Sequence, residues 1–322
     1  MGDYLQYGGQ AVIEGVMMRS PRFVAIACRR PDGGITVHEE PISGSILGRL
    51  RWLNRPLLRG TLALVDAMVL GMRALRFSAS VQAEAIGGCA AEAGASTSPR
   101  GRLNDIWIAG TLAFAFVFGT TLFIALPTLM TQLVQARLGI GGSVARNAVD
   151  GVIRIAIFLG YIGLISRMEN IRRVFQYHGA EHKAINTLEG GRPLVMEACL
   201  IASRIHPRCG TSFVIVVLLA SILVHSLFPR PDAAPVRIAL HTALIPVVAG
   251  LAYEIIKMAG RMRNATPLRV LLAPGLWSQR LTTREPDAEQ VEVALCALNA
   301  VLAREEGREP ALPEPGVPAA VA

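Results

Sequence analysis

One stretch of this chain carries no charged residue over 25 consecutive positions. It covers residues 106–130 and reads IWIAGTLAFAFVFGTTLFIALPTLM. As an α-helix it would be about 37 Å long, which exceeds the ~30 Å hydrocarbon core of a bilayer. Because a backbone in lipid must satisfy its own hydrogen bonds, this stretch predicts a transmembrane helix.

Three further apolar stretches have lengths suited to membrane helices, at residues 148–166, 211–228 and 236–256. Composition agrees, since 52% of the residues are hydrophobic and 17% are charged, against about 25% charged in typical soluble domains. The sequence therefore predicts a mainly α-helical, polytopic membrane protein with about four spans. A small cytoplasmic head containing a β-hairpin is expected beside them.

The regions outside the spans differ from one another in composition. Two β-prone runs, FVAIACRR and ITVHEEPI, flank PDGG, which predicts the hairpin. Residues 60–77 are apolar but contain Asp66 and Arg73, which favours an interfacial or re-entrant helix over a span. The predicted organisation is a Gly-rich, irregular arm and the hairpin at 1–48, a basic amphipathic or re-entrant helix at 49–82, a linker at 83–105, the transmembrane bundle at 106–256 with a cytoplasmic loop at 167–210, a cytoplasmic segment and helix at 257–305, and a disordered tail at 306–322.

The segment after the last predicted span has two parts. The stretch around PGLWSQRLTTREP is predicted to be extended. Val291, Leu295 and Leu298 recur at helical spacing, so residues 287–304 are predicted to form an amphipathic helix outside the membrane.

Basic residues alternate between the predicted loops. The loop at 167–210 holds seven Lys and Arg residues, whereas the loop at 131–147 holds two. Cytoplasmic loops of membrane proteins carry the excess of Lys and Arg. With four spans, this bias predicts a multipass protein of the inner (cytoplasmic) membrane with both termini in the cytoplasm. The five scattered cysteines suit that reducing compartment.

The net charge of +8 does not indicate nucleic-acid binding in this chain. Basic loops account for the charge of a membrane protein, and the chain lacks an aromatic-plus-basic nucleic-acid motif. The expected partners are membrane lipids, further copies of the chain in a homo-oligomer, and a protein partner at the cytoplasmic face.

The segment YHGAEHKAIN, residues 177–186, concentrates polar side chains just after a predicted span. In a helix, His178 and His182 would share a face one turn apart, with Glu181 on the neighbouring surface. The pattern H-x-x-E-H is that of inverted zincins, in which two imidazoles bind a metal and the glutamate handles the proton of a water. We therefore expect the histidines to bind zinc or another divalent metal and Glu181 to act as the catalytic base. A basic surface helix that happens to contain two histidines is the alternative.

A third ligand must come from elsewhere in the chain. The cluster HPRCGTSF, residues 206–213, offers His206 and Cys209, and zinc accepts both nitrogen and sulfur. Glu254, at the end of the last predicted span, and Glu14, within the glycine-rich GGQAVIEGV, are further candidates. Four protein ligands would favour a structural metal, whereas three ligands and an open position would favour hydrolysis.

Five motifs of this chain resemble those of the YqhQ-like family of bacterial membrane proteins. They are YGGQAVIEGVMMRSP, LLRGTLALVDAMVLGMRAL, YHGAEHKAIN, HPRCGTSF and PGLWSQRLTTREPD, in the family order. The resemblance implies a multipass membrane protein of unknown function, and members are often labelled predicted metal-dependent enzymes. It marks the positions Glu14, His178, Glu181, His182, His206, Arg208 and Cys209.

Three classes of function are open at this point. The first is a metal-dependent hydrolase with its site on the cytoplasmic side. The second is a non-enzymatic membrane scaffold or assembly factor whose polar loop binds protein. The third is a small-solute transporter that acts as an oligomer and uses His225, His241 and Glu254. Ionisable residues inside membrane spans are costly and often have a functional role.

Overall fold

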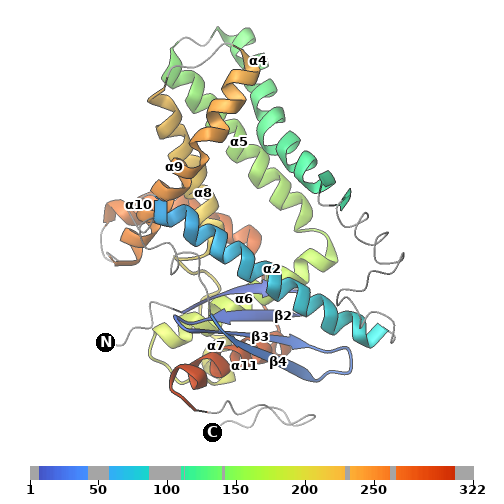
Figure 1. Cartoon of the computed structure of the whole chain (residues 1–322). Helices are drawn as coiled ribbons and strands as arrows, with labels where there is room; N and C mark the ends of the chain where they lie inside the picture. The colour runs from blue at the N-terminus through green and yellow to red at the C-terminus, as the bar shows by residue number, and fades with distance from the viewer. Residues whose placement is uncertain are drawn as a thin grey trace.

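The computed structural model describes residues 7–42, 58–86, 110–111, 113–139, 142–228, 233–261 and 266–308. Figure 1 shows a helical bundle above a head that is built on a β-sheet. Most of the predicted linker and nearly all of the predicted tail lie outside the described residues, as do residues 49–57 of the predicted basic helix.

Four apolar helical passes form the bundle. They are a π-helix η3, Thr121–Ala125, that leads into α4, Leu126–Leu138, followed by α5, Ser143–Ile165, α8, Gly210–Ser226, and α9, Ala234–Arg261. Three stretches are long and apolar enough to cross a membrane, namely Ala113–Leu138, Val144–Ile165 and Val236–Met258. The 17 residues of α8 extend about 26 Å, slightly less than the ~30 Å hydrocarbon core. The predicted polytopic helical fold is confirmed, with a shorter third pass.

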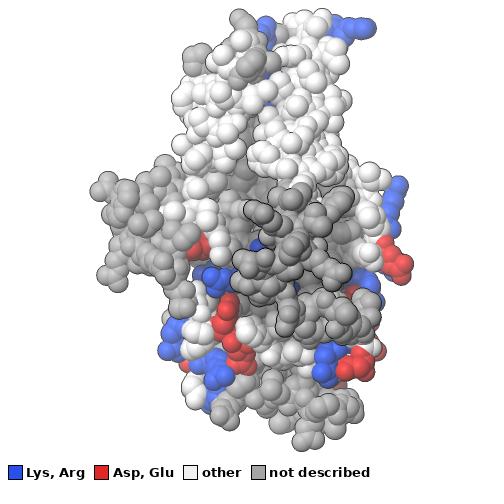
Figure 2. Space-filling model, turned by 45° about the vertical axis from the view of Figure 1, so that its right-hand side comes forward, with Lys and Arg blue, Asp and Glu red and all other residues white. Residues whose placement is uncertain are grey.

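The surface of the bundle differs from that of the head. On the face shown in Figure 2, acidic and basic residues gather around the head, and the flank of the bundle is free of them except near its far end. Large apolar side chains on the outside of the bundle include Phe114, Phe116 and Leu133. Such a continuous apolar flank suits lipid rather than water. These observations indicate that the chain associates with a membrane.

The head contains a four-stranded antiparallel sheet of order β1-β2-β3-β4. Its strands are β1, Gly8–Val12, β2, Gly15–Arg19, β3, Phe23–Arg29, and β4, Ile35–Pro41. The hairpin predicted around PDGG is β3–β4, and Gly33 supplies the positive φ of 88° in its turn. The irregular arm predicted before it is wrong for the described residues, because β1 and β2 pair there over their whole length.

Helices cover both faces of the sheet, as Figure 1 shows. α6, Glu169–Glu189, and α11, Ala288–Glu305, pack on one face, and α2, Leu58–Ile86, crosses the other between the sheet and the bundle. Along β2, Val16 and Met18 join the core with α6 and α11, whereas Met17 between them joins the core with α2. This period of two is that of a strand buried on both faces. The predicted C-terminal amphipathic helix is confirmed as α11.

Two predictions about local structure need correction. The segment around PGLWSQRLTTREP is not extended over its first half, because α10, Thr266–Thr282, continues through Pro274 and Gly275. A Cβ at Gly275 would lie 3.0 Å from the Cβ of Ser212, so α10 packs closely on α8 and this packing outweighs the poor local helix propensity. The predicted loop at 167–210 contains α6 and a short helix α7, Met196–Leu200.

Candidate metal centre

Helix α6 positions two histidines one turn apart at its most buried part. His178 and His182 have ring centroids 4.4 Å apart, with an angle of 62° between the ring planes. The helix is buried from Tyr177 to Leu188 over most positions, because it packs between the sheet, α11 and the residues that precede α8. The segment predicted to be helical is therefore helical, and it presents both imidazoles to the interior of the head.

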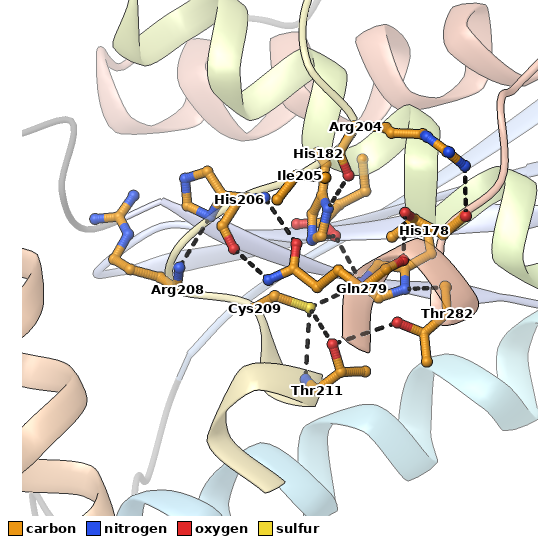
Figure 3. Close-up of polar contacts among 12 residues, drawn as sticks. His178, His182, Arg204, Ile205, His206, Arg208, Cys209, Thr211, Gln279 and Thr282 are labelled. Carbon is orange, nitrogen blue, oxygen red and sulfur yellow. Dashed lines mark hydrogen bonds and ion pairs between the residues drawn. The ribbon is translucent and has the colours of Figure 1, made fainter. Parts of the chain in front are cut away.

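Cys209 brings a thiol to the same point from the start of α8. It is the N-cap residue of that helix, and its Sγ accepts from the backbone N–H of Thr211 at 3.4 Å. The Nε2 atom of His178 lies 3.2 Å from this Sγ. One ligand atom from each of His178, His182 and Cys209 lies within 4.8 Å of the other two. Figure 3 shows the three side chains pointing toward one another.

The backbone fixes the orientation of both imidazoles. The Nδ1 atom of His178 lies 2.9 Å from the carbonyl oxygen of Thr282, and that of His182 lies 2.7 Å from the carbonyl oxygen of Arg204 (Figure 3). A carbonyl oxygen only accepts, so each Nδ1 carries the hydrogen and each Nε2 keeps its lone pair. Imidazoles that bind metals are held in this way by a second hydrogen bond.

The carboxylate of Glu181 lies next to the Nε2 atoms of both imidazoles. Its Oε2 atom is 3.6 Å from Nε2 of His182 and 4.0 Å from Nε2 of His178. Burial raises the pKa of this carboxyl, and the imidazoles of His178 and His206, together with the backbone N–H of Gly9, oppose part of that rise. Burial likewise lowers the pKa of His182, which favours the neutral imidazole that a metal needs.

Strand β1 closes the centre on the side of Glu181. A Cβ at Gly9 would lie 2.7 Å from Cγ of Glu181 and 2.7 Å from the carbonyl oxygen of Met17. A glycine is therefore required where the strand passes over the carboxylate. The glycine-rich N-terminal segment therefore passes over this site as a strand.

The donor set fits a zinc ion. Around tetrahedral zinc, with bonds of about 2.05 Å to nitrogen and about 2.3 Å to sulfur, nitrogen and sulfur ligands lie roughly 3.5 Å apart. The 3.2 Å between Nε2 of His178 and Sγ of Cys209 is close to this value. Two neutral imidazoles and a thiolate suit zinc better than calcium or magnesium, which bind oxygen ligands.

His206 and Arg208 lie beside this centre, and both contact Glu189. The Nε2 atom of His206 is 3.4 Å from Oε2 of Glu189, and the guanidinium of Arg208 forms an ion pair with the same carboxylate. The His206 ring lies 5.8 Å from that of His182 between centroids. The structure thus brings three of the four expected ligands together and places His206 in an ion-pair cluster next to them.

The remaining candidates lie elsewhere in the molecule. Glu14, with a φ of 50° in the turn between β1 and β2, makes two hydrogen bonds of 2.6 and 2.5 Å with Arg173. Glu254 of α9 makes an equivalent pair with Arg59 of α2, also at 2.6 and 2.5 Å. His241 lies in the bundle with its Nδ1 3.1 Å from Nη2 of Arg154.

Sequence reasoning missed Gln279, which holds the backbone beside the centre. Its side chain accepts from the N–H of His206 at 2.9 Å and donates to the carbonyl of the same residue at 2.7 Å. It also donates to the hydroxyl of Ser212 at 2.7 Å. Gln279 belongs to the motif PGLWSQRLTTREPD, but its burial and its partners are tertiary, so residue type alone gave no signal of its role.

Comparison with known proteins assigns the chain to a family. Residues 55–304 match the family described as a protein of unknown function, DUF1385. The chain belongs to this family. It is 35% identical over 301 residues to the uncharacterized protein YqhQ of Bacillus subtilis (strain 168), covering 92% of each chain. No solved structure matches the chain.

These findings confirm the YqhQ-like resemblance seen in the sequence. The residues matched by the family model include α6 and the start of α8, so all three converging side chains lie within the family's own region. Gly9 and Glu14 precede it, at the sheet edge that covers the centre.

Proposed function

We propose that this chain is a membrane-embedded, zinc-dependent hydrolase whose centre lies where the head meets the bundle. His178, His182 and Cys209 would hold the metal. The observation that supports this most is the approach of their ligand atoms to within 4.8 Å of one another, while both Nδ1 atoms are held by carbonyl oxygens. Zinc in such a site supplies a Lewis acid and lowers the pKa of water.

Glu181 is the residue proposed to accept a proton. Its carboxylate lies within 4.0 Å of both Nε2 atoms, so it faces the position at which a substrate water would react. Burial raises the pKa of this carboxyl above its ordinary value, and a general base works best when its pKa lies near the working pH. The carboxylate is deeply buried, which keeps bulk water from competing for the proton.

A substrate would approach the centre past His178. Its side chain is 16% exposed, against 2% for that of His182. The hydroxyl of Thr211 lies 3.1 Å from Sγ of Cys209, and the hydroxyl of Thr282 lies 3.4 Å from that of Thr211. Thr282 is buried at 2% exposure, whereas Thr211 is half-buried, so the Thr211 hydroxyl is the one that can offer a hydrogen bond to a polar substrate group.

A structural metal is the second candidate, and the same carboxylate favours it. Oε2 of Glu181 is near enough to both imidazoles to become a fourth ligand after a small side-chain shift. Such a closed site would fasten α8 to α6 without chemistry, which suits a scaffold or assembly factor.

Replacement of Glu181 by glutamine distinguishes the two candidates. The purified full-length protein should contain about one zinc per chain by elemental analysis. For the hydrolase, Glu181→Gln keeps the zinc and lowers the turnover of fluorescent casein or p-nitrophenyl esters by about 10²-fold or more. For the structural metal, the same variant loses zinc.

Glu169→Gln, at an exposed position in the first turn of α6, is the matched control and should leave zinc and turnover unchanged. Zinc-loaded protein that turns over neither probe faster than Glu181→Gln would refute the hydrolase. Negligible zinc in the unaltered protein would refute both candidates.

We also propose an orientation in the inner membrane, with the head and both termini in the cytoplasm. The head, with its predicted basic loop, lies at one end of the bundle, and the positive-inside bias supports placing this end in the cytoplasm. Fusions of alkaline phosphatase after residue 185 should be inactive, and fusions of a cytoplasmic fluorescent protein at the same position should be bright. An active phosphatase fusion there would reverse the assignment.

A further inference from the structure

Arg237 is a buried cation of the bundle whose charge is unmatched. The residue is 5% exposed, and its Nε and Nη2 atoms have no hydrogen-bond partner in the described part of the chain. It lies in α9, one turn before His241, within a stretch apolar enough to cross a membrane. A buried guanidinium without an acceptor is strongly unfavourable, so its retention points to a partner that is not part of these helices.

The acidic groups of the bundle are already used by other arginines. Asp150 accepts from Nε of Arg154 at 2.7 Å. Glu254 accepts from Arg59 at 2.6 and 2.5 Å. In the described residues of α4, α5, α8 and α9 these are the two acidic residues, so neither is left for Arg237.

Arg154, a half-buried arginine of the same bundle, shows the contrast. Each nitrogen of Arg154 has a partner, because Nη1 donates to the carbonyl of Phe123 at 3.2 Å and Nη2 donates to Nδ1 of His241 at 3.1 Å. Phe123 belongs to the π-helix η3. Every side-chain nitrogen of Arg154 therefore has a hydrogen-bond partner, whereas Nε and Nη2 of Arg237 have none among the described residues.

The two unpartnered atoms of Arg237 form one edge of the guanidinium. The same pair, Nε and Nη2, grips both carboxylate oxygens of Glu254 from Arg59 and both oxygens of Glu14 from Arg173. This side-on fork matches two oxygens of a carboxylate or a phosphate. The missing hydrogen-bond acceptor of Arg237 is thus an oxyanion with two oxygens.

We propose that Arg237 binds the phosphate group of a ligand inside the bundle, with two phosphate oxygens across Nε and Nη2. His225 lies in the same bundle, with its ring 4.0 Å from that of His241. Its Nδ1 lies 2.6 Å from the carbonyl of Ser221, and its buried Nε2 has no partner among the described residues. That Nε2 can accept a hydrogen bond from the P–OH of inorganic phosphate or from a hydroxyl of a glycerol headgroup, and an ionised carboxylate has neither group.

The phosphate can come from a lipid headgroup or from free phosphate. α9 begins at the end of the bundle away from the head, as Figure 1 shows, and headgroups lie at such an end. Both sources present the same oxygens to the fork, so the experiment is built to separate them.

The test uses the full-length protein in detergent and in nanodiscs. Inorganic phosphate should raise the melting temperature of the unaltered protein in detergent, and native mass spectrometry should show phosphatidylglycerol retained from mixed nanodiscs in preference to phosphatidylcholine. Arg237→Gln should weaken binding by about tenfold or more, and Arg237→Lys, which keeps the charge but loses the fork, should bind with intermediate strength. A response to phosphate assigns the site to the free anion, and retention of phosphatidylglycerol without that response assigns it to lipid.

Arg137→Gln is the matched control, because Arg137 is an exposed arginine at the end of α4. It should bind both probes like the unaltered protein, and the melting temperature of each variant without added ligand reports its folding. If Arg237→Gln fails to fold, the comparison of Arg237→Lys with the unaltered protein tests the proposal instead. Binding that is equal in the unaltered protein and the Arg237 variants, or that falls equally in Arg137→Gln, would overturn the proposal.

Discussion

The head and the bundle each contain a pair of neighbouring histidines, and the two pairs are held in different ways. In the head, His178 and His182 direct both Nδ1 atoms to backbone carbonyls and both Nε2 atoms toward a thiol. In the bundle, Nδ1 of His241 faces the guanidinium of Arg154, and only His225 has its Nδ1 on a carbonyl. The rings are at similar distances, 4.4 Å and 4.0 Å, so ring proximity does not separate the pairs.

The difference lies in the groups around the rings. A metal needs lone pairs that converge, and these exist where the second nitrogen of each imidazole is held elsewhere. Where one nitrogen accepts from an arginine, the imidazole is instead part of an ion-pair network. Nδ1 contacts, rather than spacing between histidines, therefore predict which pair binds metal.

The largest expected effect is loss of zinc from the head pair alone. His178→Ala and His182→Ala should each reduce bound zinc from about one per chain to a small fraction, because two ligands no longer fill the site. His225→Ala and His241→Ala are the matched controls and should retain it. Elemental analysis of the four purified variants makes the comparison, and zinc loss in the bundle variants would contradict it.

Next in size is the effect of removing the counter-ion of the bundle. Asp150→Asn removes the carboxylate that neutralises the half-buried Arg154, which should destabilise the fold by about 3 kcal/mol. Zinc content of the protein that remains folded should be unchanged, because this ion pair lies outside the head. A thermal unfolding scan in detergent measures the first quantity. Unfolding at the unaltered temperature would show that the pair contributes little.

A smaller effect is expected where the backbone supports the metal centre. A Cβ at Gly179 would lie 2.1 Å from the carbonyl oxygen of Arg284, so Gly179→Ala must push apart α6 and the segment that holds Nδ1 of His178. We expect a loss of about 1–3 kcal/mol in stability, together with weaker zinc binding in a chelator competition.

Gly163 in α5 provides the control for this substitution, because a Cβ there meets no atom within 4 Å. Gly163→Ala should be neutral or stabilise by about 0.5–1 kcal/mol, as alanine favours helix. Equal destabilisation by both substitutions would show that close approach at Gly179 has no special cost.

The smallest effect concerns which thiols react. Burial raises the pKa of Cys28 to about 12 and that of Cys296 to about 11, so both should resist iodoacetamide at pH 8 in the folded protein. Cys209 should become alkylated only after zinc is removed with a chelator. Mass spectrometry of tryptic peptides, with and without the chelator, gives the pattern; alkylation of Cys209 that is independent of the chelator would count against its role as a ligand.

The elements that depend on residues close together in the chain could be predicted from the sequence. A charge-free stretch, a hairpin turn and a period of 3.6 each depend on neighbours in the chain, so the spans, β3–β4 and α11 were accessible. The helical spacing of His178 and His182 likewise predicted their shared face. Cys209 was named because it follows His206 in the same predicted loop as the histidine pair and zinc accepts sulfur as well as nitrogen.

The partners of the charged residues were not accessible in the same way. His206 was predicted as a ligand, with Glu14 and Glu254 as further candidates, and each instead contacts a charged group that is distant in the sequence or on another element. The carbonyls of Thr282 and Arg204 that orient the imidazoles leave no trace in residue type, because every residue has a carbonyl. The glycines of β1 and β2 were read as irregular because glycine is uncommon in strands, and the close passage of β1 over Glu181 that requires Gly9 is a tertiary contact.

Cys209 is both the N-cap residue of α8 and the residue that supplies the thiol of the candidate centre. A helix is stiff along its axis, so a displacement of α8 driven by thicker or thinner lipid would move this sulfur relative to two imidazoles fixed on another element. Ligand geometry tolerates only a few tenths of an ångström. A change in the acyl-chain length of the surrounding lipid would thus change metal affinity by moving the Cys209 side chain.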